Sequence, residues 1–196
     1  MSHAEQVALL LAGELAILPT DTVYGIACAA ASPAAVERLY ALKQRPSTQP
    51  TAILLGSVES LLSDALPEAH GRVGVLLSSV LPGPITLVIP NPGRRFAHVC
   101  GDDHTRIGVR VPRLTPEVAA LADAVGGLVA TSANLRGRPA PAAFGEVPAE
   151  LLEAAAIAID GGTLPGAASA VIDVTGDRPV VLRDGPGVEA VLAAVR

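Results

Sequence analysis

Short apolar runs alternate with helical patterns along the whole chain, and several neighbouring runs are joined by very few residues. Residues 15–18 and 23–30, for example, are separated only by Pro19-Thr20-Asp21-Thr22. Two parallel strands need a crossover connection of about a dozen residues or more, usually a helix. The sequence therefore predicts an α/β fold with a mixed sheet of parallel and antiparallel strands and flanking helices, rather than a strictly parallel sheet.

Capping residues and helix breakers locate the expected elements. Ser2 and Glu5 have the spacing of a capping box, whereas Ser32-Pro33 and Thr115-Pro116 each combine an N-cap residue with a proline at the first helical position. The first helix is expected to end near Gly13, and the others to cover residues 34–42, 57–66, 68–80, 115–126, 148–156 and 188–195. The further expected strands are 51–55, 85–89, 96–100, 107–111, 128–131, 157–159, 169–174 and 180–183.

Composition narrows the class of protein. Half of the 196 residues are hydrophobic, yet no run of 18 apolar residues occurs, and the N-terminus lacks a basic segment before its short apolar stretch. We therefore expect neither a transmembrane helix nor a signal peptide, and one domain over residues 1–196 because no linker or repeat is evident. Two cysteines without metal-binding spacing favour a reduced, cytoplasmic setting. The net charge of −5 argues against a surface that coats nucleic acid.

Familiar nucleotide and catalytic motifs are missing. The chain has no G-x-x-x-x-G-K-[ST] loop, no G-x-G-x-x-G after its first strand and no G-x-S-x-G elbow. Asp102-Asp103-His104 could hold a metal ion, but a solvated turn explains these residues better. We therefore predict no protein-bound metal site.

Polar clusters at the ends of the expected strands and helices remain, and each has a plain structural explanation. The threonines around Asp21 could cap a turn, and Lys43 with Arg45 could complement a helix dipole. Arg106, Gly108 and Arg110 share one face of a strand, which a solvated edge strand explains equally well. The other clusters are Ser132-Ala133-Asn134, residues 166–169 and Arg183 with Asp184. Together they supply cations and hydroxyls for one cleft in an acidic protein, as a polyanionic small molecule requires.

Lysine usage adds one observation. The chain has 13 arginines and a single lysine, Lys43. Biased composition alone can explain this ratio. The alternative is a site that needs the compact ammonium of lysine beside the planar fork of Arg45, which together could bracket a polyphosphate.

The clusters, in this order, resemble the YrdC-like family, whose core members are threonylcarbamoyl-AMP synthases. The resemblance covers nearly the whole chain and is strongest in the pairing of Lys43-x-Arg45 with Ser132-x-Asn134. The matching segments are LPTDTVYGIACAA, ALKQRP, LPGPITLVIP, IGVRVP, TSANLRGRPAP, GAASAVIDV and VLRDG. The resemblance implies a single-domain, twisted mixed sheet with a large cationic cavity.

The resemblance also implies an activity. Such an enzyme joins L-threonine, bicarbonate and ATP into L-threonylcarbamoyladenylate and pyrophosphate, with Mg²⁺ expected on the triphosphate. Other proteins then transfer the threonylcarbamoyl group to adenosine 37 of tRNA. These transfer proteins are the expected partners, with weak or no direct nucleic-acid binding and no membrane contact.

Site residues follow from the matching motifs. The resemblance implies threonine contacts for Thr22, Arg110, Ser132 and Ser169. It implies ATP contacts for Arg45, Gln49, Asn134 and Arg183. Lys43, Arg45, Ser132 and Asn134 are the expected catalytic residues, with Lys43 between phosphate and carbamate. The roles of Arg136 and Arg138 stay open, between phosphate contact and a solvent-exposed lip.

Two positions depart from the family pattern. Leu54 stands where relatives often have histidine, and Ala140-Pro141-Ala142 stands where they often read S-P-T. These departures keep two alternatives open: a paralogue that binds RNA or a nucleotide without catalysis, and an enzyme acting on another carbamoyl-adenylate. The low aromatic content, 2%, counts against an extended RNA-stacking surface.

Overall fold

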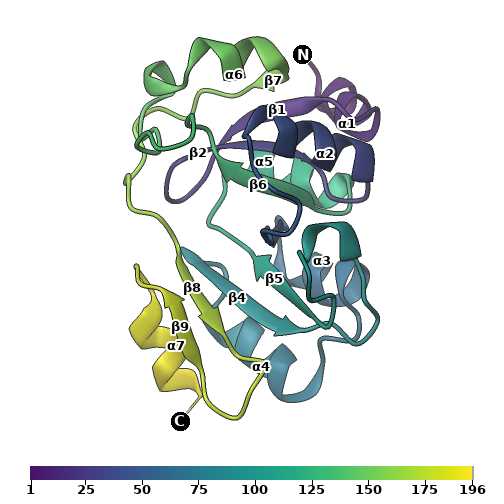
Figure 1. Ribbon diagram of the computed structural model, residues 1–196, viewed down its shortest axis with the longest axis vertical. Coiled ribbons are helices and arrows are strands. Elements are labelled where there is room, and N and C mark those ends of the chain that lie inside the picture. Colours follow the sequence, from purple (N-terminus) through teal and green to yellow (C-terminus); the bar gives the residue numbers. More distant parts are fainter. Residues whose placement is uncertain (196) are drawn as a thin grey trace.

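A computed structural model describes residues 1–195, and its central feature is the predicted mixed sheet (Figure 1). Nine strands lie in the order β7-β1-β2-β6-β3-β5-β4-β8-β9. Three neighbouring pairs are parallel, β1 with β7, β3 with β5 and β4 with β8, and the other pairs are antiparallel. The strands are β1 Leu15–Pro19, β2 Tyr24–Ala29, β3 Ile53–Leu54, β4 Ile85–Pro90, β5 Arg106–Arg110, β6 Leu128–Ser132, β7 Ala155–Ala158, β8 Ala170–Asp173 and β9 Val180–Arg183.

The helices follow the predicted caps. The hydroxyl of Ser2 accepts a hydrogen bond from the Glu5 amide, and the Glu5 carboxylate accepts one from the Ser2 amide, so the capping box of α1 is present. Ser32 and Thr115 cap α2 and α5 in the predicted way. The helices are α1 His3–Leu11, α2 Pro33–Leu42, α3 Val58–Ser60, α4 Gly71–Val80, α5 Pro116–Ala124, α6 Ala149–Ala154 and α7 Val188–Ala194.

The predicted strand at 96–100 is wrong. Phe96 has a left-handed backbone with φ 50°, and residues Ala97–Val99 form a 3-10 turn. The side chain of Asn91 explains the departure, because it accepts from the Arg95 amide and donates to the Arg95 carbonyl. These local bonds offer the backbone an alternative to a strand.

Several predicted bounds also shift. The helix predicted at 57–66 divides into α3 and a π-helical turn at Leu61–Ala65, and α4 begins only at Gly71, where φ is +61°. The strand predicted at 51–55 shortens to β3. The helix predicted at 148–156 ends at Ala154, and β7 begins at Ala155, where it pairs with β1. A short 3-10 turn at Phe144–Glu146 was not predicted.

Hydrophobic cores lie on both faces of the sheet. Along β1, Leu15 and Ile17 belong to the core that includes α2, whereas Ala16 and Leu18 belong to the core that includes α1 and α5. This alternation is the side-chain period of a strand buried on both sides. Figure 1 shows α1, α2, α5 and α6 gathered around β1, β2 and β6, and α4 and α7 beside the other end of the sheet.

The second core does not extend over the whole sheet. Ile107 and Val109 of β5 point into the first core, but Arg106, Gly108 and Arg110 alternate with them and face the opposite side. There they line a pocket together with residues of β4 and β8. The pocket thus occupies the part of this sheet face that α1 and α5 leave uncovered.

Candidate active site

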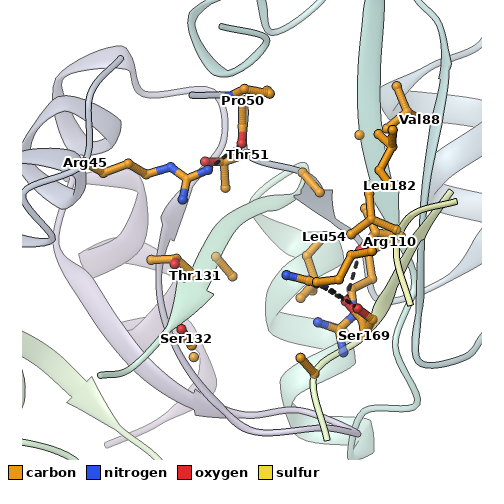
Figure 2. A pocket seen from close by; sticks show the side chains of 18 of the residues that line it. Arg45, Pro50, Thr51, Leu54, Val88, Arg110, Thr131, Ser132, Ser169 and Leu182 are labelled. Atoms are coloured by element: carbon orange, nitrogen blue, oxygen red, sulfur yellow. Dashed lines mark hydrogen bonds between the residues drawn. The ribbon is translucent and has the colours of Figure 1, made fainter. Parts of the chain in front are cut away.

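The pocket has a volume of about 630 Å³, which is within the range of small-molecule sites. In Figure 2, Arg45, Thr131 and Ser132 lie on one side of it, and Arg110, Ser169 and Leu182 lie on the other. Residues far apart in sequence therefore converge on one cavity. Six of the nine predicted site residues are in its wall: Thr22, Arg45, Arg110, Ser132, Ser169 and Arg183.

The Lys43 side chain does not line the cavity but is hydrogen-bonded to the wall residue Ser132. It forms the C-cap of α2, and its Nζ donates 2.7 Å to the carbonyl of Ser132 and 3.1 Å to Oδ1 of Asn134, with a further bond to the Asn134 carbonyl. The Ser132 hydroxyl donates 2.5 Å to the same Oδ1. Burial, with a smaller effect of the Arg45 charge, lowers the pKa of Lys43 to about 8. The predicted pairing of Lys43 with Ser132 and Asn134 is present in space.

Arg45 enters the pocket just beyond α2. Gln44 adopts a left-handed backbone with φ 48°, which turns the chain after the helix. The Arg45 guanidinium lies 5.8 Å from the centre of the Tyr40 ring, and Nη2 donates 2.5 Å to the Pro50 carbonyl. Burial lowers the pKa of Arg45. The Nε of Arg45 is buried and has no hydrogen-bond partner among the described residues.

Arg110 is held by the loop between β1 and β2. Its Nη2 donates 2.6 Å to Oδ1 of Asp21 and 2.8 Å to the hydroxyl of Thr22. The other Asp21 oxygen accepts from the amide of Arg113 at 3.0 Å. The Nε of Arg110 is buried without a partner in the part of the chain that the structure describes.

Arg183 reaches the pocket from β9, the last strand of the sheet. Its Nε donates 2.8 Å to the carbonyl of Ser169, and its Nη2 donates 3.0 Å to the Ser169 hydroxyl. That hydroxyl lies 3.3 Å from the Thr86 hydroxyl. Burial, followed by repulsion from Arg110, lowers the pKa of Arg183. Arg110 and Arg183 therefore present two guanidinium groups on one side of the cavity.

Arg106 forms a different kind of contact at the pocket rim. Its Nε lies 2.5 Å from Asp103 and its Nη1 lies 3.0 Å from Asp173. Hydrogen bonds from Thr105 and Arg106 lower the pKa of Asp103 to about 2.

The solvated-edge explanation for the strand that carries Arg106 is wrong, because β5 lies between β3 and β4. Within residues 1–195, no group of three or more His, Cys, Asp or Glu side chains could hold a metal ion.

The remaining predicted residues lie outside the cavity wall. Gln49 is exposed on the loop after Arg45 and does not line the pocket. Arg136 and Arg138 are exposed, and Arg136 donates 3.3 Å to the Gln44 carbonyl. At the positions that depart from the family pattern, Leu54 and Ala140 line the pocket, whereas Pro141 and Ala142 do not.

Sequence reasoning did not single out Thr86 and Asp173, which also line the cavity. Alternation within two predicted strands could have found them. Leu87 and Ile172 point into the first core, so their neighbours Thr86 and Asp173 face the opposite side.

The unpartnered atoms indicate what the cavity can bind. Among the described residues, three buried side-chain polar atoms lack a hydrogen-bond partner, and two of these are the Nε atoms of Arg45 and Arg110. Buried donors are normally paired. Both atoms belong to arginines that line the pocket, and a carboxylate or phosphate is the group that a guanidinium binds best.

Taken together, these observations define an α/β protein with an arginine-lined pocket on an uncovered face of a mixed sheet. The chain belongs to the Sua5/YciO/YrdC family, whose model, described as "Telomere recombination", matches residues 8–185. The family predicted from the sequence motifs is thereby confirmed.

Individual relatives agree with this assignment. The chain is 35% identical to a threonylcarbamoyl-AMP synthase of Chromohalobacter salexigens over 92% of this chain and 91% of the relative. Among solved structures, Pyrococcus abyssi Sua5 complexed with L-threonine matches 100% of this chain and 59% of its own, with 29% identity and a TM-score of 0.84. Escherichia coli YciO matches 94% of this chain and 89% of its own, with 26% identity and a TM-score of 0.81. The chain thus spans about three fifths of the Pyrococcus protein.

None of the helices within residues 1–195 combines the length and apolar character needed to cross a membrane. Cys28 and Cys100 are both free thiols and both buried.

Proposed function

We propose that the protein synthesises L-threonylcarbamoyladenylate from L-threonine, bicarbonate and ATP, with release of pyrophosphate. The observation that carries this proposal is the convergence of Arg45, Arg110 and Arg183 on one cavity of a chain from this family. The reaction brings together a carboxylate, a carbamate and a triphosphate, so it needs fixed cations more than it needs an acid or a base.

The threonine end of the site is assigned to the side of the cavity with Arg110. The guanidinium of Arg110 has free N–H groups for the amino-acid carboxylate, and Thr22 lies 2.8 Å from its Nη2. Ser169 supplies a further hydroxyl group on this side of the cavity, and Ser132 supplies one on the opposite side. The L-threonine in the structure of the Pyrococcus relative supports this substrate class.

The nucleotide end is assigned to Arg45, Asn134, Gln49 and Arg183. Arg45 and Arg183 place guanidinium groups in the cavity wall. Asn134 is connected to that wall through Ser132 and Lys43. Gln49 is exposed on the loop that follows Arg45, so contact with ATP requires that loop to approach the cavity.

The chemistry proceeds in two bond-forming stages. The amine of threonine joins the carbon of bicarbonate with loss of water, giving a carbamate. A carbamate oxygen then attacks the α-phosphorus of ATP, and the bond to pyrophosphate breaks. Lys43 stabilises the negative charge as it moves from carbamate to phosphate, and the arginines hold the two anions in line.

Mg²⁺ enters this proposal only as the ion that accompanies the triphosphate. The carboxylates of Asp103 and Asp173 at the rim are paired with Arg106, so they do not form a cage for a metal ion. The product would pass to proteins that transfer the threonylcarbamoyl group to tRNA.

The direct test is to detect the product. Purified protein with ATP, bicarbonate and threonine should release pyrophosphate and form a species with the mass of threonylcarbamoyladenylate. Omission of threonine is the control. Pyrophosphate release that does not depend on threonine would support an enzyme acting on another carbamoyl-adenylate. ATP binding without any turnover would support a nucleotide-binding paralogue.

A further inference from the structure

Asp21 is the residue that fixes the orientation of the Arg110 guanidinium. It lies in the short loop between β1 and β2, and its side chain is only 10% exposed, beside an Arg110 side chain that is 15% exposed. Its Oδ1 accepts from Arg110 Nη2 at 2.6 Å, and its Oδ2 accepts from the Arg113 amide at 3.0 Å. One carboxylate therefore ties the guanidinium to the backbone just beyond the strand that carries it.

The neighbouring hydroxyls belong to the same loop. Thr20 Oγ1 donates to the Val23 carbonyl at 2.7 Å and accepts from the amides of Thr22 and Val23 at 3.2 and 3.3 Å. The Thr22 hydroxyl lies 2.9 Å from Thr20 Oγ1 and accepts from Arg110 Nη2 at 2.8 Å. Thr22 alone could not hold Arg110 as firmly as a carboxylate does.

Charge gives a second reason for a carboxylate at this position. Arg110 shares the cavity with Arg183, and repulsion from Arg110 contributes to the lowered pKa of Arg183. The carboxylate of Asp21 offsets part of this positive charge through its ion pair with Arg110. It engages only Nη2 of Arg110, and Nε remains buried without a partner in the described chain. The ion pair therefore orients Arg110, and both of its side-chain hydrogen bonds use Nη2, which leaves Nη1 as the donor for an incoming anion.

We propose that Asp21 is a positioning residue for the threonine carboxylate: it does not touch substrate, but it aims Arg110 at it. This inference rests on the proposed function for the identity of the ligand, although the orientation of Arg110 can be measured without it.

The test compares Asp21→Ala and Asp21→Asn with Asp123→Asn. Asp123 is a matched control, because its carboxylate accepts from the Gly56 amide at 2.7 Å and lies outside the pocket wall. For Asp21→Ala we expect the KM for threonine to rise about tenfold to a hundredfold, the usual effect of losing a charge-assisted hydrogen bond. The KM for ATP should change less than about twofold. Asp21→Asn keeps an acceptor for Arg110 and should fall between Asp21→Ala and the wild type.

A second readout does not depend on activity. Hydrogen exchange of the Arg110 Nε proton, followed by NMR, should be slow in the wild type and in Asp123→Asn, and clearly faster in Asp21→Ala. Faster exchange supports the proposal even if the wild-type protein shows no threonine-dependent turnover, a result that would remove the proposed function alone. Unchanged exchange in Asp21→Ala overturns the proposal. Equal rises in both KM values, as from general loosening, also overturn it.

Discussion

The ammonium of Lys43 lies 2.7 Å from the carbonyl oxygen of Ser132, although the two residues are 89 positions apart in the chain. This contact fixes the end of α2 against the turn that follows β6. Two further bonds, both to Asn134, occupy the remaining protons of the ammonium. A phosphate that approached this ammonium would have to replace one of these bonds.

The first prediction concerns the pH dependence of turnover. Burial lowers the pKa of Lys43 from 10.5 to about 8, so its ammonium loses its proton as the pH rises through about 8. Turnover at saturating substrate should decline over that interval. In Lys43→Arg the charge persists, because guanidinium is not deprotonated in this range. That variant, even if slower, should lack the decline, and an identical decline in both proteins would remove the assignment to Lys43.

The second prediction concerns stability. Because the pKa of Lys43 is lower in the folded chain, the unfolded chain binds more protons between pH 8 and 10.5. The free energy of unfolding of the wild type should therefore rise with pH across this window, relative to Lys43→Met, which has no titrating group at this position. Urea denaturation of both proteins at pH 8 and pH 10 measures the difference. A difference that shrinks as the pH rises would contradict the lowered pKa.

The third prediction concerns the two cations at the end of α2. Lys43→Ala and Arg45→Ala should each lower turnover by about a hundredfold or more, as the loss of one preorganised electrostatic group commonly does. Arg45→Lys separates charge from geometry, because lysine keeps the charge but cannot form the planar fork. Steady-state pyrophosphate release measures all three variants. Near-normal rates in both alanine variants would exclude these residues from the chemistry.

Much of the fold was predictable from local signals. The caps at Ser2, Ser32 and Thr115 were read correctly, as were the short connections that require a mixed sheet. The error at residues 96–100 comes from a local side-chain contact that the apolar pattern did not reveal. The apolar Phe96 and Val99 do pack against or within the core, but the Asn91 side chain imposes a turn on this segment.

The candidate site was predictable as a set of residues but not as a geometry. Motif spacing indicated Lys43 and Asn134, but not that Lys43 would be buried against the backbone of the Ser132–Asn134 turn. Likewise, the pattern of Arg106 and Arg110 did not separate an edge strand from an interior one. Strand order depends on long-range pairing that no local window contains.

The fourth prediction concerns the hydroxyl of Ser169, a side chain that is buried. Ser169→Ala removes the 3.0 Å acceptor of Arg183 Nη2, while the 2.8 Å bond to the backbone carbonyl remains. The KM for ATP should rise about tenfold, because Arg183 is less firmly oriented. Thr86→Val removes the other hydroxyl contact of Ser169 and keeps both bonds to Arg183, so its KM for ATP should stay close to the wild-type value. Equal effects of the two substitutions would contradict this role.

The fifth prediction concerns the packing of α5 against the segment after β3. A Cβ added to Gly56 would lie 2.1 Å from the carbonyl oxygen of Ala119, a backbone atom that cannot move aside without shifting the helix. Gly56→Ala should therefore destabilise the protein by about 1–3 kcal/mol or more, as overpacking does. Gly145 is the matched control, because an added Cβ there meets nothing within 4 Å and its φ is not positive. Thermal unfolding of both variants measures the difference, and a Gly56→Ala protein as stable as Gly145→Ala would show that α5 is not packed as closely as the structure indicates.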